Sequence, residues 1–226
     1  MLRAIAVGLV AAAAGCSSPA TGGVDGGGGG DAPPSDRDGG PNDVDAPPAG
    51  VGLELDLVAP GLPWVATGVA VERVRLWLRD VRVIGDSAPG DARTSLAQLE
   101  LDFEPGRDPP PVSFPQAPPG NYSQLAARLG RSDGSQSFEI QGTVTIAGQP
   151  HELEIRDLNI ADVSVALDVR VETAAVAVTV ALDLSFLGGI DWSSAPQDGN
   201  GRIQLEDGGP IVDAVRAGLV AGFHAE

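Results

Sequence analysis

The chain has few residues of the kinds that build metal or redox sites. Its 226 residues include one cysteine, one methionine, two histidines and no lysine. A single cysteine cannot form an internal disulfide, so a folded body must be stabilised by its apolar core. Two histidines without a free thiol cannot furnish a typical zinc or copper site. We attribute the absence of lysine to genomic base composition.

Positive charge is also scarce. Fourteen arginines against 31 acidic residues give a net charge of −17. Such a chain is repelled by nucleic acid and by anionic lipid headgroups, so we expect neither as a partner. The apolar run near the N-terminus, Ala4 to Ala14, has only eleven residues. A bilayer-spanning helix needs ~20 apolar residues. After the positive charge of Arg3, this short run is typical of a secretory signal.

A cysteine stands where such a signal would be cleaved. The run Ala13-Ala14-Gly15-Cys16 resembles the lipobox of bacterial lipoproteins. The resemblance implies a signal peptide over residues 1–15 and acyl chains on Cys16 that attach the protein to a membrane. At ~0.8 kcal/mol per buried methylene, two or three chains hold far better than one. The residue after the cysteine is Ser17. In Gram-negative lipoproteins, Asp at this position favours retention in the inner membrane, so Ser17 indicates the outer membrane. The alternatives for Cys16 are that it is a small buried side chain or a reactive thiol.

Residues 16–50 are predicted to be a disordered linker behind the lipidated cysteine. Residues 17–50 contain 10 Gly, 6 Pro and 6 Asp, and no core can form from that composition. A flexible chain of this length spans roughly 30 Å. The alternative is a calcium-binding tract of nonapeptide repeats, but the spacing is irregular. The layout resembles Gram-negative lipoproteins that hold one β-rich domain on a Gly/Asp/Pro tether.

Residues 51–226 are predicted to form an antiparallel β-sandwich of about 8–10 strands with one C-terminal helix. Apolar and polar residues alternate there, and turn signals recur about every ten residues. In residues 69–84 the apolar phase changes at Glu72-Arg73 and at Arg79-Asp80. These changes predict bulges, or two strands that meet at the second point. The regular segments 163–171 and 176–186 are expected to pair as the central hairpin.

The C-terminus is predicted to be helical. Pro210 suits a first helical turn, and apolar residues follow at helical spacing up to Phe223. A ridge of Ala214, Gly218 and Gly222 would let this helix approach the sheet or one end of the sandwich closely.

One short turn carries a second resemblance. Pro118-Pro119-Gly120-Asn121-Tyr122 resembles the start of a strand in transthyretin-like and collagen-binding-protein B-type sandwiches. The resemblance implies that Gly120 makes the turn and that Tyr122 covers the edge of the core.

One strand carries a candidate ligand face. Its members share the odd positions of the strand and combine arginine with tryptophan, residues that interfaces favour. They are Arg73, Arg75, Trp77 and Arg79. With Trp77 as a stacking platform they would bind an anionic glycan or an envelope protein. The alternative is that the arginines pair across strands with Glu100, Asp102 or Glu104 and that Trp77 is covered.

Catalysis and metal binding have less support. Gly130-Arg131-Ser132-Asp133-Gly134 matches the GxSxG motif of serine hydrolases, but it falls between two predicted strands and not before a helix. His151 and His224 are the only bases available to Ser132. Side chains with oxygen ligands suited to calcium lie near the C-terminus: Asp191, Asp198, Asn200, Glu206 and Asp207. The alternative is that these residues form polar turns.

The sequence therefore favours a non-enzymatic, lipid-anchored envelope protein that binds or scaffolds another component, without a cofactor. The alternatives are a calcium- or carbohydrate-binding surface module and a lipid-anchored serine hydrolase. The ligand and the oligomeric state do not follow from the sequence.

Overall fold

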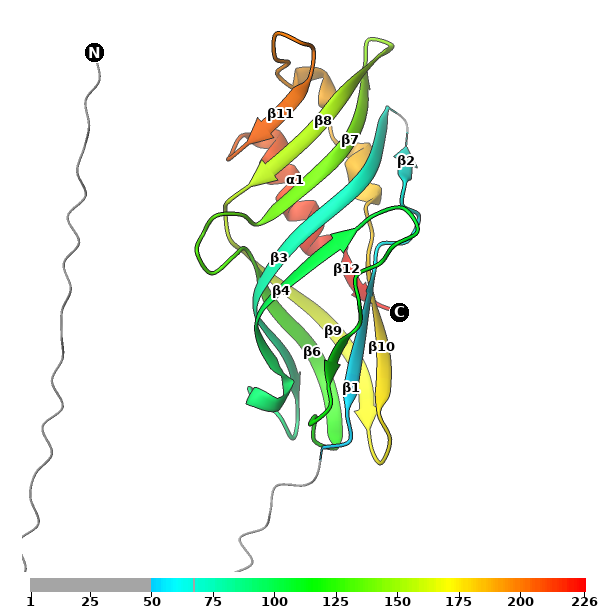
Figure 1. Cartoon of the computed structure of the whole chain (residues 1–226), viewed down its shortest axis with the longest axis vertical. Helices are drawn as coiled ribbons and strands as arrows, with labels where there is room; N and C mark the ends of the chain where they lie inside the picture. The colour runs from blue at the N-terminus through cyan, green and yellow to red at the C-terminus, as the bar shows by residue number, and fades with distance from the viewer. Residues whose placement is uncertain (1–49, 67) are drawn as a thin grey trace, which may run out of the picture. The chain divides into compact units, whose positions relative to one another are not determined.

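The computed structural model describes residues 50–66 and 68–226, and these form two β-sheets and one α-helix (Figure 1). The mainly β fold class with a C-terminal helix is thereby confirmed. The predicted signal peptide, the candidate lipidation site Cys16 and the predicted linker up to residue 49 lie outside the described residues.

The described residues contain twelve strands, of which three have only three residues. The strands are β1 (Leu53–Val58), β2 (Trp64–Ala66), β3 (Val69–Gly85), β4 (Ser95–Phe103), β5 (Val112–Phe114), β6 (Gly120–Leu129), β7 (Phe138–Ile146), β8 (Gln149–Asp157), β9 (Ala161–Val171), β10 (Val176–Leu182), β11 (Ile203–Glu206) and β12 (Phe223–Ala225). The helical elements are α1 (Pro210–Gly222) and the 3-10 turns η1 (Ala92–Thr94), η2 (Ser185–Gly189) and η3 (Trp192–Ser194).

The long strand β3 is the spine of the larger sheet. On one side it pairs with β2 and β4, and on the other with β7 and then β6. Its register shifts between Val71 and Arg73 and again between Arg79 and Arg82. These are the two points where the apolar phase changes. The bulge interpretation is therefore confirmed, and the alternative of two strands is wrong.

Strand structure is interrupted at one level of this sheet, between β6 and β7 and again between β8 and β9. Strands β6 and β7 run in the same direction along β3 and are separated by residues 130–137, while β9 and β8 run beside them and are separated by residues 158–160. Backbone hydrogen bonds join the breaks, from Trp77 N to Ser137 O (3.0 Å) and from Ser137 N to Asp157 O (2.7 Å). We call this level, comprising residues 77–80, 130–137 and 157–160, the waist.

The smaller sheet has the order β12-β10-β1-β5, and it corrects one prediction. The predicted central hairpin of residues 163–171 and 176–186 does not form, because β9 pairs with β6 whereas β10 pairs with β1 and β12. Residues 172–175 carry the chain from one sheet to the other. The second strand also ends at Leu182. The Asp183 carboxylate then accepts hydrogen bonds from Ser185 N (2.8 Å) and Oγ (2.7 Å), which starts η2.

Helix α1 packs against β9 and β8 of the larger sheet and also contacts η2, β10 and β12, while β10 lies beside β9 (Figure 1). Its close approach depends on glycine, as predicted. A Cβ at Gly218 would lie 2.1 Å from a ring carbon of Phe186, and one at Gly222 would lie 2.5 Å from Asp183 O. Ala214 was expected on the same ridge but is exposed. None of the helices in the described residues is long and apolar enough to cross a membrane.

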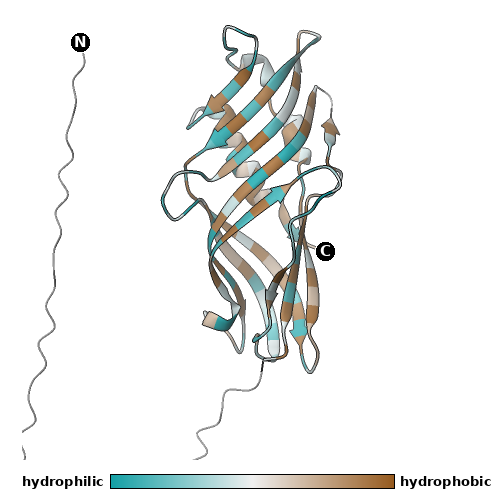
Figure 2. Ribbon diagram, viewed as in Figure 1, coloured by the Kyte–Doolittle hydropathy of each residue, from teal (hydrophilic) through white to brown (hydrophobic). Residues whose placement is uncertain are grey.

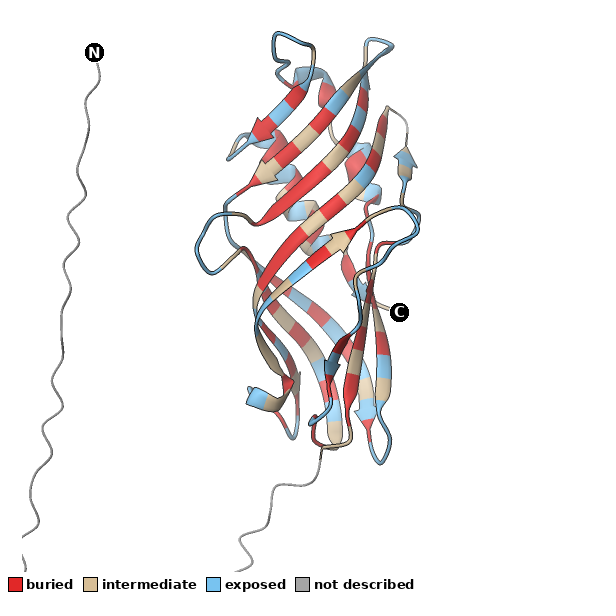
Figure 3. Ribbon diagram, in the orientation of Figure 1, coloured by how far each residue is buried: buried red, intermediate tan, exposed pale blue. Residues whose placement is uncertain are grey.

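One apolar core joins both sheets and the helix. Hydrophobic and hydrophilic residues alternate along most strands (Figure 2), and buried positions follow the same alternation (Figure 3). The core includes Leu55 of β1, Phe138 of β7 and Val215 of α1. Tyr122 is also buried, as the resemblance at residues 118–122 implied, and its hydroxyl donates to Pro118 O at 2.7 Å. Each sheet thus has one face on the core.

Candidate functional site

Charged residues of alternating sign cross the outer face of the larger sheet in one row. The row follows the strand register from β4 through β3, β7 and β8 to β11, and its members are Asp102, Arg75, Glu139, Arg156 and Glu206. Each neighbouring pair has a nitrogen and an oxygen within 4.0 Å. Opposite charges on adjacent strands stabilise a sheet. The charged groups of this row are therefore paired with one another.

The candidate ligand face on β3 is corrected by these contacts. Arg73 donates from Nε to Asp102 Oδ1 at 2.8 Å and lies 3.0 Å from Glu104 Oε1. This hydrogen bond holds the pKa of Asp102 below its ordinary value and raises the pKa of Arg73. Trp77 is only 2% exposed and cannot serve as a stacking platform. The structure agrees with the alternative for Arg73 and Arg75, which pair with acidic residues of β4 and the residue after it, and for Trp77, which is covered, but not for Arg79.

Arg79 differs from Arg73 and Arg75 because no acidic residue among those described pairs with it. Its neighbours in the register are Gln98 on β4 and Arg128 on β6. Its Nη1 reaches the carbonyl oxygen of Arg131 at 3.5 Å, and the guanidinium carbon of Arg131 lies 5.8 Å from the centre of the Trp77 ring. A cation over an aromatic ring is a favourable arrangement. Arg79, Arg131 and Trp77 are thus gathered at the waist.

The GxSxG segment forms a turn at the waist and not a nucleophile elbow. Ser132 is exposed between β6 and β7, and its Oγ donates to Gln98 Oε1 at 3.3 Å. His151 Nδ1 lies 2.7 Å from Gly201 O, and His224 Nδ1 lies 3.1 Å from Gly222 O. Among the described residues no hydrogen bond joins either histidine to Ser132, whereas a serine hydrolase needs a histidine bonded to its nucleophile.

The candidate calcium ligands cap turns. Asp191 accepts from Ser193 N at 3.0 Å and Oγ at 2.6 Å, whereas Asp198 accepts from the amides of Asn200 (2.8 Å) and Arg202 (2.9 Å). These hydrogen bonds lower the pKa of both carboxyl groups. In residues 50–66 and 68–226 no three His, Asp or Glu side chains are grouped to hold a metal ion. Glu206 faces Arg156, and Asp207 accepts from Leu158 N at 3.0 Å.

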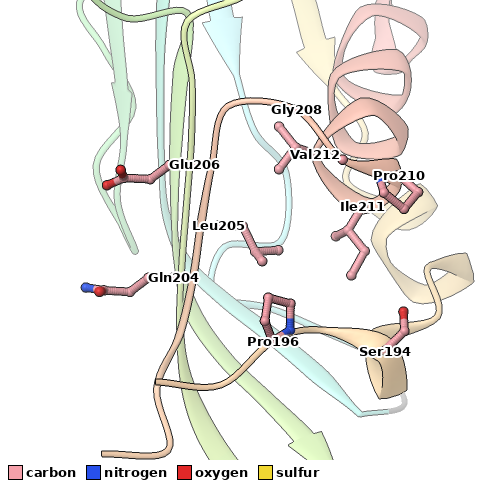
Figure 4. A pocket seen from close by; sticks show the side chains of 10 residues that line it. Ser194, Pro196, Gln204, Leu205, Glu206, Gly208, Pro210, Ile211 and Val212 are labelled. Atoms are coloured by element: carbon pink, nitrogen blue, oxygen red, sulfur yellow. The ribbon is translucent and has the colours of Figure 1, made fainter. Parts of the chain in front are cut away.

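A hollow of about 290 Å³ lies between β11, the segment after η3 and the start of α1. Figure 4 shows Leu205 of β11 and Ile211 of α1 pointing toward one another across it, with Pro196 below them. Gln204 and Glu206 point to the opposite side of the strand (Figure 4). The lining is therefore mostly apolar, as in many small-molecule and side-chain binding sites.

One rim of the hollow carries polar backbone groups. Gly208 and Gly209 both have φ +85°, a conformation that side chains rarely adopt, and they turn the chain into α1. No side chain caps this end of the helix. The first amides of a helix have no partner within it, so they are free to donate to an acceptor at this rim. The hollow thus combines an apolar lining with a few donors.

Sequence reasoning did not find this hollow. It depends on β11 lying parallel to β8, with Leu205 opposite Ile155, and on α1 returning over them. The one local signal is Gly208-Gly209-Pro210, of which only Pro210 entered the helix prediction.

No protein family, curated protein or solved structure matches this chain. The resemblances to Gram-negative lipoproteins and to transthyretin-like sandwiches therefore stay predictions.

Proposed function

We propose that this chain is a lipid-anchored protein of the bacterial cell envelope, held at the outer membrane by acyl chains on Cys16, that binds or scaffolds another envelope component without catalysis. The anchoring part is supported by the short apolar run, the small residues before Cys16 and the Gly/Asp/Pro-rich stretch that follows. Calcium is not part of the proposal, because the candidate acidic ligands cap turns.

The binding part is carried by one observation, the apolar hollow between β11 and α1. Its size suits an apolar side chain or a short acyl segment of a partner. Burial of such a group gains roughly 1.5–3 kcal/mol, which is enough to anchor an interface but not to hold a free small molecule tightly. The amides at the start of α1 would orient a carbonyl or carboxylate oxygen of the same partner.

The anchor is tested by labelling cells with palmitate in the presence and absence of globomycin, with the Cys16→Ser variant as control. We expect label on the wild type alone and accumulation of the precursor under globomycin. A wild-type protein that is processed normally, carries no label and is released without detergent would overturn the anchor.

The hollow is tested by crosslinking in intact envelopes, followed by pull-down of the full-length chain. Ser194 lines the hollow and is exposed, so Ser194→Trp should fill it without disturbing the core. Ser193 is the matched control, since it is exposed on the same turn but does not line the hollow. We expect a crosslinked component with the wild type and Ser193→Trp that is depleted with Ser194→Trp. Equal yields from all three chains would contradict the proposal.

A further inference from the structure

Three buried N–H groups at the waist have no hydrogen-bond acceptor within the described part of the chain. They are Trp77 Nε1, Arg79 Nε and Arg131 Nε. Trp77 is 2% exposed, so its indole cannot be solvated by bulk water. A buried donor without an acceptor has lost its hydrogen bond to water without a replacement, which destabilises the folded state. Arg156 Nε is also unpaired, but the other nitrogens of Arg156 pair with Glu139, Glu154 and Glu206. The three donors at the waist lie on neighbouring side chains, and their grouping indicates an acceptor from outside the chain.

The charges around Arg79 also indicate an acceptor from outside the chain. Arg79 lies directly opposite Arg128 on β6 and opposite uncharged Gln98 on β4. Like charges in facing positions destabilise a sheet. Among the described residues no carboxylate oxygen lies within 4.0 Å of Arg79, in contrast to Arg73 and Arg75 on the same strand. Although the chain has 31 acidic residues, none of those described pairs with Arg79, so its charge is available to an anion from outside the chain.

The acidic residues nearest to this cluster are engaged with other groups. Asp80 and Asp162 both pair with Arg128, at 3.7 and 3.3 Å. Asp133 lies 3.9 Å from Arg131 Nε, but its Oδ1 accepts from Ser135 N (2.9 Å) and Ser135 Oγ (2.7 Å). These hydrogen bonds keep Asp133 in its own turn, so it does not satisfy Arg131.

We propose that an oxyanion, the phosphate or carboxylate group of an envelope component, binds at the waist between Arg79 and Arg131 beside the indole N–H of Trp77. Guanidinium groups match the geometry of phosphate and carboxylate and form charge-assisted hydrogen bonds with them. Both arginines are half-buried, so the oxyanion first meets their outer nitrogens. Binding through the Nε–H groups requires both side chains to rotate. The site does not depend on the hollow beside α1, and only the source of the oxyanion, an envelope component, rests on the proposed function.

The indole N–H of Trp77 gives a direct readout. The chain has three tryptophans, so a full-length protein labelled with ¹⁵N-tryptophan shows three indole resonances. Trp192 Nε1 already donates to Leu187 O at 3.2 Å and serves as an internal reference. Inorganic phosphate and acetate are titrated separately at pH 7.5, with sodium chloride added to hold the ionic strength constant. We expect a saturable shift of the Trp77 resonance alone.

Two variants and one control decide the outcome. Arg79→Gln and Arg131→Gln should weaken binding about ten-fold or more, the loss expected for a charge-assisted hydrogen bond. Arg131 lies in a loop, so its variant stays informative even if the Arg79 variant misfolds. Arg170→Gln is the control, because this arginine is 74% exposed and pairs with Glu172. The oxyanion that binds more tightly identifies the class of ligand. A shift that never saturates with either anion, or one that both variants retain, overturns the proposal.

Discussion

Replacement of Arg216 by methionine should destabilise the domain more than any change at a surface arginine. Arg216 of α1 donates from Nη2 to Asp157 Oδ1 at 2.8 Å and from Nε to Asp157 Oδ2 at 2.5 Å. The Asp157 side chain is fully buried at the waist, and Arg216 is 17% exposed. This pair is the polar link between the helix and the sheet that it covers. Methionine keeps most of the apolar stem but leaves the carboxylate buried without its counter-ion.

The size of the effect follows from burial. Removal of one partner of a buried ion pair costs about 3–5 kcal/mol, and the partial exposure of Arg216 favours the lower end. For a domain of this size, about 3 kcal/mol corresponds to a decrease in Tm of roughly 6–12 °C. Arg170→Met removes an exposed pair and should cost less than about 1 kcal/mol. Differential scanning calorimetry of the variants measures both.

The pH dependence gives an independent check. Burial alone would raise the pKa of Asp157, but hydrogen bonds from Arg216 and Asn159 lower it below its ordinary value. The ionised carboxylate therefore stabilises the wild type above the unfolded-state pKa of about 3.9, and this contribution is lost as the pH falls through the lower folded value. In Arg216→Met burial dominates, so the pKa rises instead. The stability deficit of this variant should then shrink on acidification.

A double-mutant cycle completes the test. Asp157→Asn combined with Arg216→Met removes both charges, so the double variant should lose less stability than the sum of the single variants. The reasoning is refuted if Arg216→Met costs no more than Arg170→Met, or if its deficit is independent of pH.

Three further predictions concern packing and metal binding. Gly142→Ala should lower the free energy of unfolding by about 1–3 kcal/mol, because the new Cβ would lie 2.1 Å from Ala70 O. The control is Gly199→Ala, whose Cβ meets nothing within 4 Å and should leave the Tm unchanged. Equal Tm values for the two variants would contradict this prediction. Removal of residues 211–226 deletes α1 and β12 and should abolish cooperative melting; a truncated chain that melts like the wild type would show that the helix is dispensable. The Tm in calcium should equal that in EDTA, and an increase with calcium would show that the acidic turns bind the ion.

The strand pattern of this chain was predictable because alternation is a local property. A strand with one face on the core repeats every two residues, so β1, β4, β7 and β9 could be located without knowledge of their partners. The bulges in β3 were visible for the same reason, since an extra residue reverses the phase. The glycines of α1 indicated close approach, although the partner, Phe186, did not follow from them.

Pairing and the candidate sites were not predictable, because they depend on contacts between residues far apart in sequence. Strands β9 and β10 are adjacent in the chain, but β10 pairs with β1, more than one hundred residues earlier. The hollow exists only where β11 joins β8 in parallel beneath α1. Arg73 and Arg79 occupy equivalent positions in the alternation, yet one faces Asp102 and the other faces Arg128.

The sequence by itself determined the composition of the core, the mainly β class, the C-terminal helix and the predicted address at Cys16, because each of these depends on residue type and short-range order. Only the tertiary structure decided which charges neutralise one another and which donors stay unpaired at the waist. The physical reason is that the energy of a charge or a buried N–H depends on its neighbours in space, and in a sheet those neighbours come from other strands.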